Sequence, residues 1–189
     1  MARKALSLLL VTAVLASLFF YAVIVLDHPW QWNVLVEYRY KFSLGFAMTL
    51  LISLFSLLGS LVLGVAAALG RRSHVLFFRY LASFYIEVIR GTPLLVQILV
   101  LFYIIGTAYR LTNRYAMGVL ILSLFAGAYV AEIIRGGLES IPSAQLETAR
   151  SLCFTKGQTY RYVIIPQLSR IVLPPLTGQF ASLVKDSSL

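Results

Sequence analysis

The chain has 189 residues, of which 60% are hydrophobic and 12% charged, and its mean hydropathy is +0.87. A soluble domain is usually about 45–50% apolar and about 25% charged, so this composition favours a protein that crosses a membrane several times. A single cysteine excludes an internal disulfide, and the net charge of +9 gathers between apolar runs, which favours membrane topology over nucleic-acid binding.

The long apolar runs predict an all-α polytopic membrane protein, because a lipid-exposed backbone must form its hydrogen bonds within its own segment. Residues 5–26 follow a basic start, as in a signal peptide. The run is longer than a signal core and lacks a clear small-residue cleavage site, so we expect a retained span. About five spans are expected, near 5–26, 44–69, 93–109 and 116–137, with an incomplete one from about 172.

Residues 75–92 are apolar but carry three charges. They form either an interfacial helix or the first part of the third span, with a break at Gly91-Thr92-Pro93. A break is the physical expectation there, because proline lacks a backbone donor and disfavours helical conformation in the residue before it.

The distribution of lysine and arginine predicts a cytoplasmic N-terminus. With this orientation, ten basic residues lie inside and four lie outside, as the positive-inside rule requires. The inner set is Arg3, Lys4, Arg71, Arg72, Arg79, Arg135, Arg150, Lys156, Arg161 and Arg170, and the outer set is Arg39, Lys41, Arg110 and Arg114.

Small residues recur every four positions in two of the expected spans. This spacing lets helix backbones approach closely in lipid, and we expect packing within the chain rather than a dimer seam. The two sets are Ser56, Ser60, Gly64 and Ala68, and Ser123, Gly127 and Ala131.

Residues 147–167 read ETARSLCFTKGQTYRYVIIPQ, a polar and basic stretch on the expected cytoplasmic side. Pro142 suits the first turn of a helix that Ser140 or Ser143 can cap. A second short helix is expected from Gln158 to Ile165, ending near Pro166. On composition alone, a solvated loop beside the bilayer is an equally good interpretation.

The order of residues in this stretch resembles the EAA loop of ABC importer permeases, which reads Glu-Ala-Ala, three residues, Gly, nine residues, Ile-x-Leu-Pro. Here Glu147-Thr148-Ala149 is followed by Cys153 and then by residues 163–166, which read VIIP. Four further segments resemble the polar amino-acid uptake branch of these permeases, in the same order, so that the resemblance covers about 44–189. They are 87–103, 128–142, 166–180 and 183–189.

The resemblance implies the transmembrane domain of a type I ABC importer at 44–189, preceded by an N-terminal span and an extracytoplasmic amphipathic segment at 1–43. It implies a permease subunit in the bacterial inner membrane that imports polar amino acids, with a cytoplasmic EAA-type loop at about 139–167 that couples ATPase closure to translocation. The implied partners are ABC ATPase subunits, a second permease subunit (identical or paralogous), an extracytoplasmic amino-acid-binding protein and the lipid bilayer. No cofactor and no nucleic acid are implied.

The resemblance also assigns roles within the loop. Glu147 is expected to make polar contacts with the ATPase, and Ala149 to keep the helix thin enough to enter a groove. Cys153 replaces the family's glycine at a turn, where a side chain at positive φ costs roughly 1–2 kcal/mol, and Gly157 is expected to share that turn. The complete set of expected loop residues is Gln145, Glu147, Thr148, Ala149, Cys153 and Pro166.

Several charges lie in or beside apolar segments. Lys185 and Asp186 are expected to line the translocation cavity, with a structural pair or an interfacial position as alternatives. Glu132 and Arg135 are spaced i, i+3 and predict a local salt bridge, and the same interpretation applies to Glu87 and Arg90.

The sequence offers no metal-spaced cluster, nucleophile motif or Gly-x4-Gly-Lys-Ser/Thr loop, so ATP hydrolysis is expected in a separate subunit. A nucleotide-independent channel or carrier and a non-transporting remnant are the alternative functions. Residues 173–189 would span only about 25 Å of a core of about 30 Å. We therefore expect the 189-residue chain to lack the family's final span.

Overall fold

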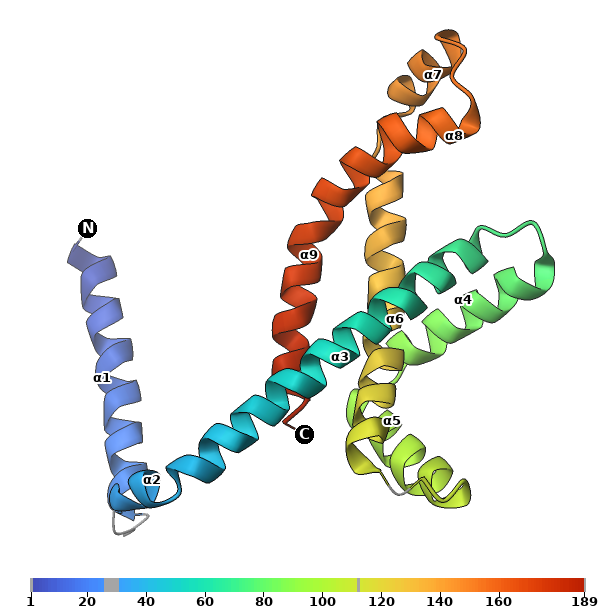
Figure 1. The fold of residues 1–189 in the computed structure, drawn as a ribbon. Coiled ribbons are helices and arrows are strands. Elements are labelled where there is room, and N and C mark those ends of the chain that lie inside the picture. The colour runs from blue at the N-terminus through green and yellow to red at the C-terminus, as the bar shows by residue number, and fades with distance from the viewer. Residues whose placement is uncertain (1, 26–30, 112, 189) are drawn as a thin grey trace. The chain divides into compact units, whose positions relative to one another are not determined.

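The computed structural model describes residues 2–25, 31–111 and 113–188, and all regular structure in these ranges is helical (Figure 1). The chain divides into two compact units, Met1–Ser43 and Leu44–Leu189. The helices are α1 (Ala2–Val25), α2 (Asn33–Glu37), α3 (Arg39–Arg71), α4 (Leu76–Gly91), α5 (Leu94–Ile98), the π-helix η1 (Leu99–Gly106), α6 (Arg114–Glu139), α7 (Ser143–Ser151), α8 (Lys156–Gln158), the π-helix η2 (Thr159–Ile164) and α9 (Ile165–Asp186).

Within the described ranges, three helical segments are long and apolar enough to cross a membrane. They are Lys4–Val25, Arg39–Arg71 and Arg114–Glu139, and a bent pair, Leu76–Gly91 with Leu94–Gly106, would supply a fourth span. The prediction of an all-α polytopic protein is confirmed. Leu26, the last residue of the first expected span, lies outside the described residues.

The third and fifth expected spans need correction. The chain bends by 114° between α4 and α5, so that residues 93–109 continue a broken helix pair rather than forming a straight span of their own. The helix expected from about 172 is α9, which begins earlier, at Ile165. It is not one of the helices that are both long enough and apolar enough to cross a membrane. Pro174 and Pro175 lie inside it on its exposed side.

The break at Gly91-Thr92-Pro93 is confirmed, and two side chains close it. Thr92 Oγ1 donates a hydrogen bond to the Val88 carbonyl (2.8 Å). Gln97 Nε2 donates to the Ile89 carbonyl (2.8 Å), to the Thr92 carbonyl (3.1 Å) and to Thr92 Oγ1 (2.8 Å). In an unbroken helix, N–H groups of the next turn would donate hydrogen bonds to the carbonyls at the end of α4. Pro93 has no N–H and the helix breaks there, so these side chains supply the donors instead.

The two small-residue stripes pack against each other where α3 crosses α6 (Figure 1). Ser123 Oγ donates to the Ser56 carbonyl (3.3 Å). A methyl group at Gly64 would lie 2.5 Å from Val130 Cγ1 and 2.9 Å from the Gly127 carbonyl oxygen. The expectation of packing within the chain is therefore confirmed, and it is the absence of side chains that permits this approach.

Helix α9 runs beside α6 and completes the second unit (Figure 1). Leu183 is fully buried and packs with Leu122 and Ala126 of α6. Ser53 Oγ of α3 donates to the Leu183 carbonyl (3.3 Å). Near the other end of α9, the side chains of Leu168 and Val172 occupy the space beside Gly137. These contacts bring α3, α6 and α9 together around one core.

Glu132 joins three helices through ion pairs. It pairs with Arg135 on its own helix, as predicted, and also with Arg71 at the end of α3 (3.3 Å) and Arg90 of α4 (3.4 Å). The predicted Glu87–Arg90 pair is wrong. The bend at Pro93 brings the end of α4 against α6, where Arg90 pairs with the less exposed carboxylate of Glu132.

Candidate functional site

The loop after α6 begins with a proline rather than with a serine cap. Pro142 (φ −60°, ψ 133°) precedes α7, and no side chain caps the first turn of α7. Ser140 ends α6, and its Oγ donates to the Gly137 carbonyl (2.8 Å). The predicted serine cap is therefore wrong, since Ser140 is the C-cap of the preceding helix and Ser143 is already helical.

Helix α7 ends in a Schellman motif whose left-handed residue is Cys153 (φ 55°). The Phe154 N–H donates to the Ala149 carbonyl (3.0 Å), and the Cys153 N–H donates to the Arg150 carbonyl (2.9 Å). The predicted glycine-like turn at Cys153 is confirmed. Gly157 takes no part in it, because Gly157 lies in α8 and its φ is not positive.

The return half of the loop starts one residue after this turn. Thr155 and Gln158 form a capping box: Gln158 N–H donates to Thr155 Oγ1 (3.3 Å), and Thr155 N–H donates to Gln158 Oε1 (2.8 Å). The chain then stays helical through η2 into α9, so the prediction of a helix ending near Pro166 is wrong. The wider turn of η2 precedes Pro166, which lies in the first turn of α9, where its missing donor does least harm.

The two faces of α7 differ in burial. Ala149 is 3% exposed and lies inside the loop, where it lines a cavity together with Phe154 and Val163. The small side chain of Ala149 therefore lets α7 pack on η2, and its expected role in thinning the helix for a groove stays a prediction. Glu147 and Ser151 lie roughly 160° around the helix from Ala149, on the exposed side.

The remaining loop residues hold the hairpin together or face solvent. Gln167 Nε2 donates to Gln145 Oε1 (2.5 Å), which ties α9 to α7. Thr148 Oγ1 donates to the Ala144 carbonyl within α7 (2.8 Å). Glu147 is exposed and forms no salt bridge with a residue in the described part of the chain.

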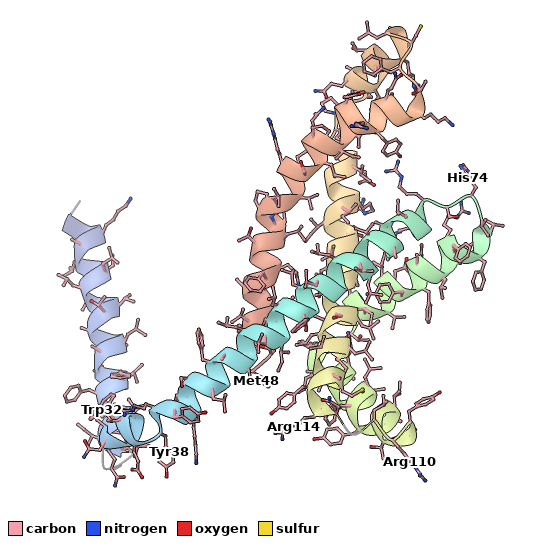
Figure 2. All side chains as sticks on the ribbon, viewed as in Figure 1. Trp32, Tyr38, Met48, His74, Arg110 and Arg114 are labelled. Atoms are coloured by element: carbon pink, nitrogen blue, oxygen red, sulfur yellow. The ribbon has the colours of Figure 1, made fainter. Side chains whose placement is uncertain are left out.

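A cavity of about 360 Å³ lies where α3, α5, η1, α6 and the end of α9 meet. Asp186 and Arg114 supply its opposite charges, and Phe102, Tyr103 and Tyr115 supply aromatic walls. Arg114 lies in the first turn of α6 (Figure 2), which Asn113 caps. Asp186 is half-buried, whereas Lys185 is exposed and does not line this cavity.

Comparison with known proteins identifies the family. Residues 60–189 match the family model described as the binding-protein-dependent transport system inner membrane component. The chain belongs to this family. The predicted membership in the amino-acid uptake branch of ABC importer permeases is confirmed by the relatives and by the solved structure that follow.

The chain is similar to two permeases of Bacillus subtilis (strain 168). It is 40% identical to the probable glutamine permease GlnM over 77% of this chain and 67% of GlnM, and 37% identical to the L-cystine permease TcyB over 77% of this chain and 62% of TcyB. It is also 37% identical to the glutamine permease GlnP of Escherichia coli (strain K12), over 77% of this chain and 67% of GlnP. The chain thus spans about two thirds of the length of these relatives.

A solved structure of an amino acid ABC transporter with histidines matches with a TM-score of 0.79 at 37% identity, over 85% of this chain and 75% of that chain. The helical path described above is therefore that of an ABC transporter permease. Relatives of this kind are membrane subunits of ABC transporters, which agrees with the lack of an ATP-binding loop in this sequence.

Sequence reasoning missed three features of the structure: the role of Gln97 at the helix break, the place of Arg114 in the 360 Å³ cavity and the ion pairs of Glu132 across helices. Gln97 was recognisable only as a lone amide in an apolar run, and Arg114 only as a basic residue at a span end. The pairing of Glu132 with Arg71 and Arg90 depends on how α3 and α4 cross α6, which no local pattern encodes.

Proposed function

We propose that this chain is the permease subunit of an ATP-driven importer of polar amino acids, and that its α7–η2 hairpin is the element that couples ATPase closure to translocation. The family match over 60–189 carries the proposal. The glutamine and cystine named for the relatives supply the substrate class.

The geometry of the hairpin supports a docking role. A short helix capped by a Schellman motif at one end and tied to α9 by the Gln145–Gln167 hydrogen bond can transmit force without a core of its own. Its outward face carries Glu147, whose carboxylate has no ion pair in the described structure. We assign Glu147 to polar contact with the ATPase, and Cys153 and Pro166 to the backbone path of the hairpin.

The distribution of basic residues supports the proposed orientation, in which the hairpin is cytoplasmic. Arg72, at the end of α3, lines one cavity with Arg150 of α7. Arg110 lies in the turn before α6 and Arg114 begins α6, both away from the α3–α4 turn that His74 marks (Figure 2). The end that collects more basic residues is the cytoplasmic one under the positive-inside rule.

We assign the 360 Å³ cavity to the translocation path, because its paired charges suit a zwitterion. Asp186 would face an ammonium group and Arg114 a carboxylate. Lys185 is exposed in this single chain, and we place it toward the cavity shared with the second permease subunit. A cysteine at position 185 in a Cys153→Ser background should then react with a water-soluble thiol reagent, and protection in every transport state would contradict this placement.

The test of the function is uptake by proteoliposomes that contain this chain with its ATPase subunit and binding protein. ATP-dependent accumulation of a labelled polar amino acid, abolished by removing the ATPase, is the expected result. Uptake that persists without nucleotide would indicate a channel or carrier instead. No uptake in the complete assembly would match a non-transporting chain.

A further inference from the structure

Another cavity, of about 250 Å³, lies between the end of α3 and the hairpin, and three cations line it. Arg72 follows α3, Arg150 comes from α7 and Lys156 begins α8. Among the residues that the structure describes, none that lines the cavity is acidic. Its remaining wall is mainly apolar and includes Phe154 and Tyr160.

These three cations are uncompensated within the described part of the chain. None of them forms a salt bridge there. Glu139, which lines the adjoining cavity with Arg72, is already paired with Arg135. Glu147, three residues before Arg150, makes no ion pair with it. Like charges gathered around one hollow repel each other, and an anion in the hollow would stabilise all three.

We propose that this cavity binds a phosphate-bearing anion, and specifically the phosphodiester headgroup of an anionic lipid. The cations provide charge-assisted hydrogen bonds for phosphate oxygens. Inorganic phosphate would leave the apolar wall beside the cations exposed to water. The glycerol and acyl carbons of a lipid would cover that wall. Basic pockets on the cytoplasmic side of transmembrane helices bind such headgroups by this chemistry.

The proposal rests on the cytoplasmic orientation and coupling role of the hairpin proposed above, and it adds a consequence for regulation. An anion held by Arg72, Arg150 and Lys156 would link the end of α3 to both halves of the hairpin. Anionic lipid should therefore raise ATP hydrolysis that is coupled to transport. Glu147 lies one helical turn from Arg150 but does not line the cavity, so variants at Glu147 and variants at the cavity residues test ATPase docking and lipid binding separately.

The test uses the assembled importer in nanodiscs of phosphatidylcholine alone or with phosphatidylglycerol. One readout is the phosphatidylglycerol retained per permease after delipidation, measured by mass spectrometry, and the other is ATP hydrolysis stimulated by the substrate-loaded binding protein. The cavity triple variant Arg72→Gln/Arg150→Gln/Lys156→Gln is compared with a charge-matched triple, Arg79→Gln/Arg161→Gln/Arg170→Gln, whose exposed residues do not line the cavity.

Wild type and the matched triple should retain phosphatidylglycerol and be stimulated by it, whereas the cavity triple should lose both effects. The single variant Lys156→Gln changes an exposed residue at the start of α8 and should not endanger folding, and it should weaken retention roughly fivefold. Equal retention by the two triples would overturn the site. Restoration of activity by inorganic phosphate in phosphatidylcholine nanodiscs would overturn the lipid assignment.

Loss of ATPase binding by the cavity triple in both lipid mixtures would show that these residues contact the ATPase instead, and would overturn the proposal. Wild-type uptake that is ATP-driven but indifferent to phosphatidylglycerol would refute the lipid site and leave the proposed function standing. An absence of ATP-driven uptake in every lipid would refute the proposed function itself.

Discussion

The helix bundle and the α7–η2 hairpin are stabilised in opposite ways. In the bundle, α3 and α6 meet through buried small residues, and Ala126, Val130 and Leu183 are fully buried. In the hairpin only Ala149 and Ile164 are buried, and helix caps and side-chain hydrogen bonds define its shape. The bundle therefore depends on close packing, whereas the hairpin keeps a defined backbone with its outer face free for a partner.

The largest effect is expected where the bundle has no room. Gly64→Leu should destabilise the protein by about 3 kcal/mol or more, because its Cβ alone would collide with Val130 and with the Gly127 backbone. Gly45→Leu on the same helix is the control, since no atom of the described residues lies within 4 Å of a Cβ there. The thermal midpoint in detergent measures both, and equal midpoints would contradict the packing described for α3 and α6.

A smaller loss is expected at the break in the bundle. Gln97→Leu removes the donor to the Ile89 and Thr92 carbonyls and should cost about 1–3 kcal/mol. Gln97→Glu should be at least as harmful, because it places a second acceptor against those carbonyls, whereas Thr92→Ser keeps the hydroxyl and should be nearly neutral. Thermal unfolding of the three variants checks this order, and a stable Gln97→Glu would show that the amide does not close the break.

The ion pairs of Glu132 should contribute less than the buried packing. Glu132→Gln leaves Arg71, Arg90 and Arg135 facing one another, and a loss on the order of 1 kcal/mol would lower the thermal midpoint by about 2–4 °C. Glu87→Gln should leave it unchanged, since Glu87 is exposed and has no salt bridge in the described structure. If both variants unfold at the wild-type temperature, the cluster does not hold α3, α4 and α6 together.

The smallest effect, and one of opposite sign, is expected in the hairpin. Cys153→Gly should stabilise the protein by up to about 1 kcal/mol, because φ is 55° at this position and glycine adopts it without strain. Arg110→Gly is the control for the backbone effect alone, since Arg110 (φ 52°) closes a similar turn before α6. A large loss of transport activity in Cys153→Gly, without such a loss in Arg110→Gly, would assign the thiol a specific role.

Sequence predicted the parts of this molecule that local chemistry determines. The break before Pro93 and the small-residue stripes of α3 and α6 follow from residue type and spacing, whereas the glycine-like turn at Cys153 follows from the resemblance to the EAA loop. The sequence did not predict that η2 continues into α9 past Pro166. A proline in the first turn of a helix cannot be distinguished by sequence alone from a proline that ends a helix. The buried position of Ala149 depends on the packing of α7 against η2, which appears only once the hairpin has closed.

The coupling role of the hairpin is tested most directly by reversing the charge on its outer face. Glu147→Lys is compared with Glu147→Gln and with Ser169→Lys, which adds a positive charge at an exposed position near the start of α9, outside α7. In proteoliposomes with the ATPase and the substrate-loaded binding protein, Glu147→Lys should insert normally and lose most of the stimulated ATP hydrolysis. Glu147→Gln should be intermediate and Ser169→Lys close to wild type. Stimulation that is unchanged in Glu147→Lys would contradict the assignment of this hairpin to ATPase coupling.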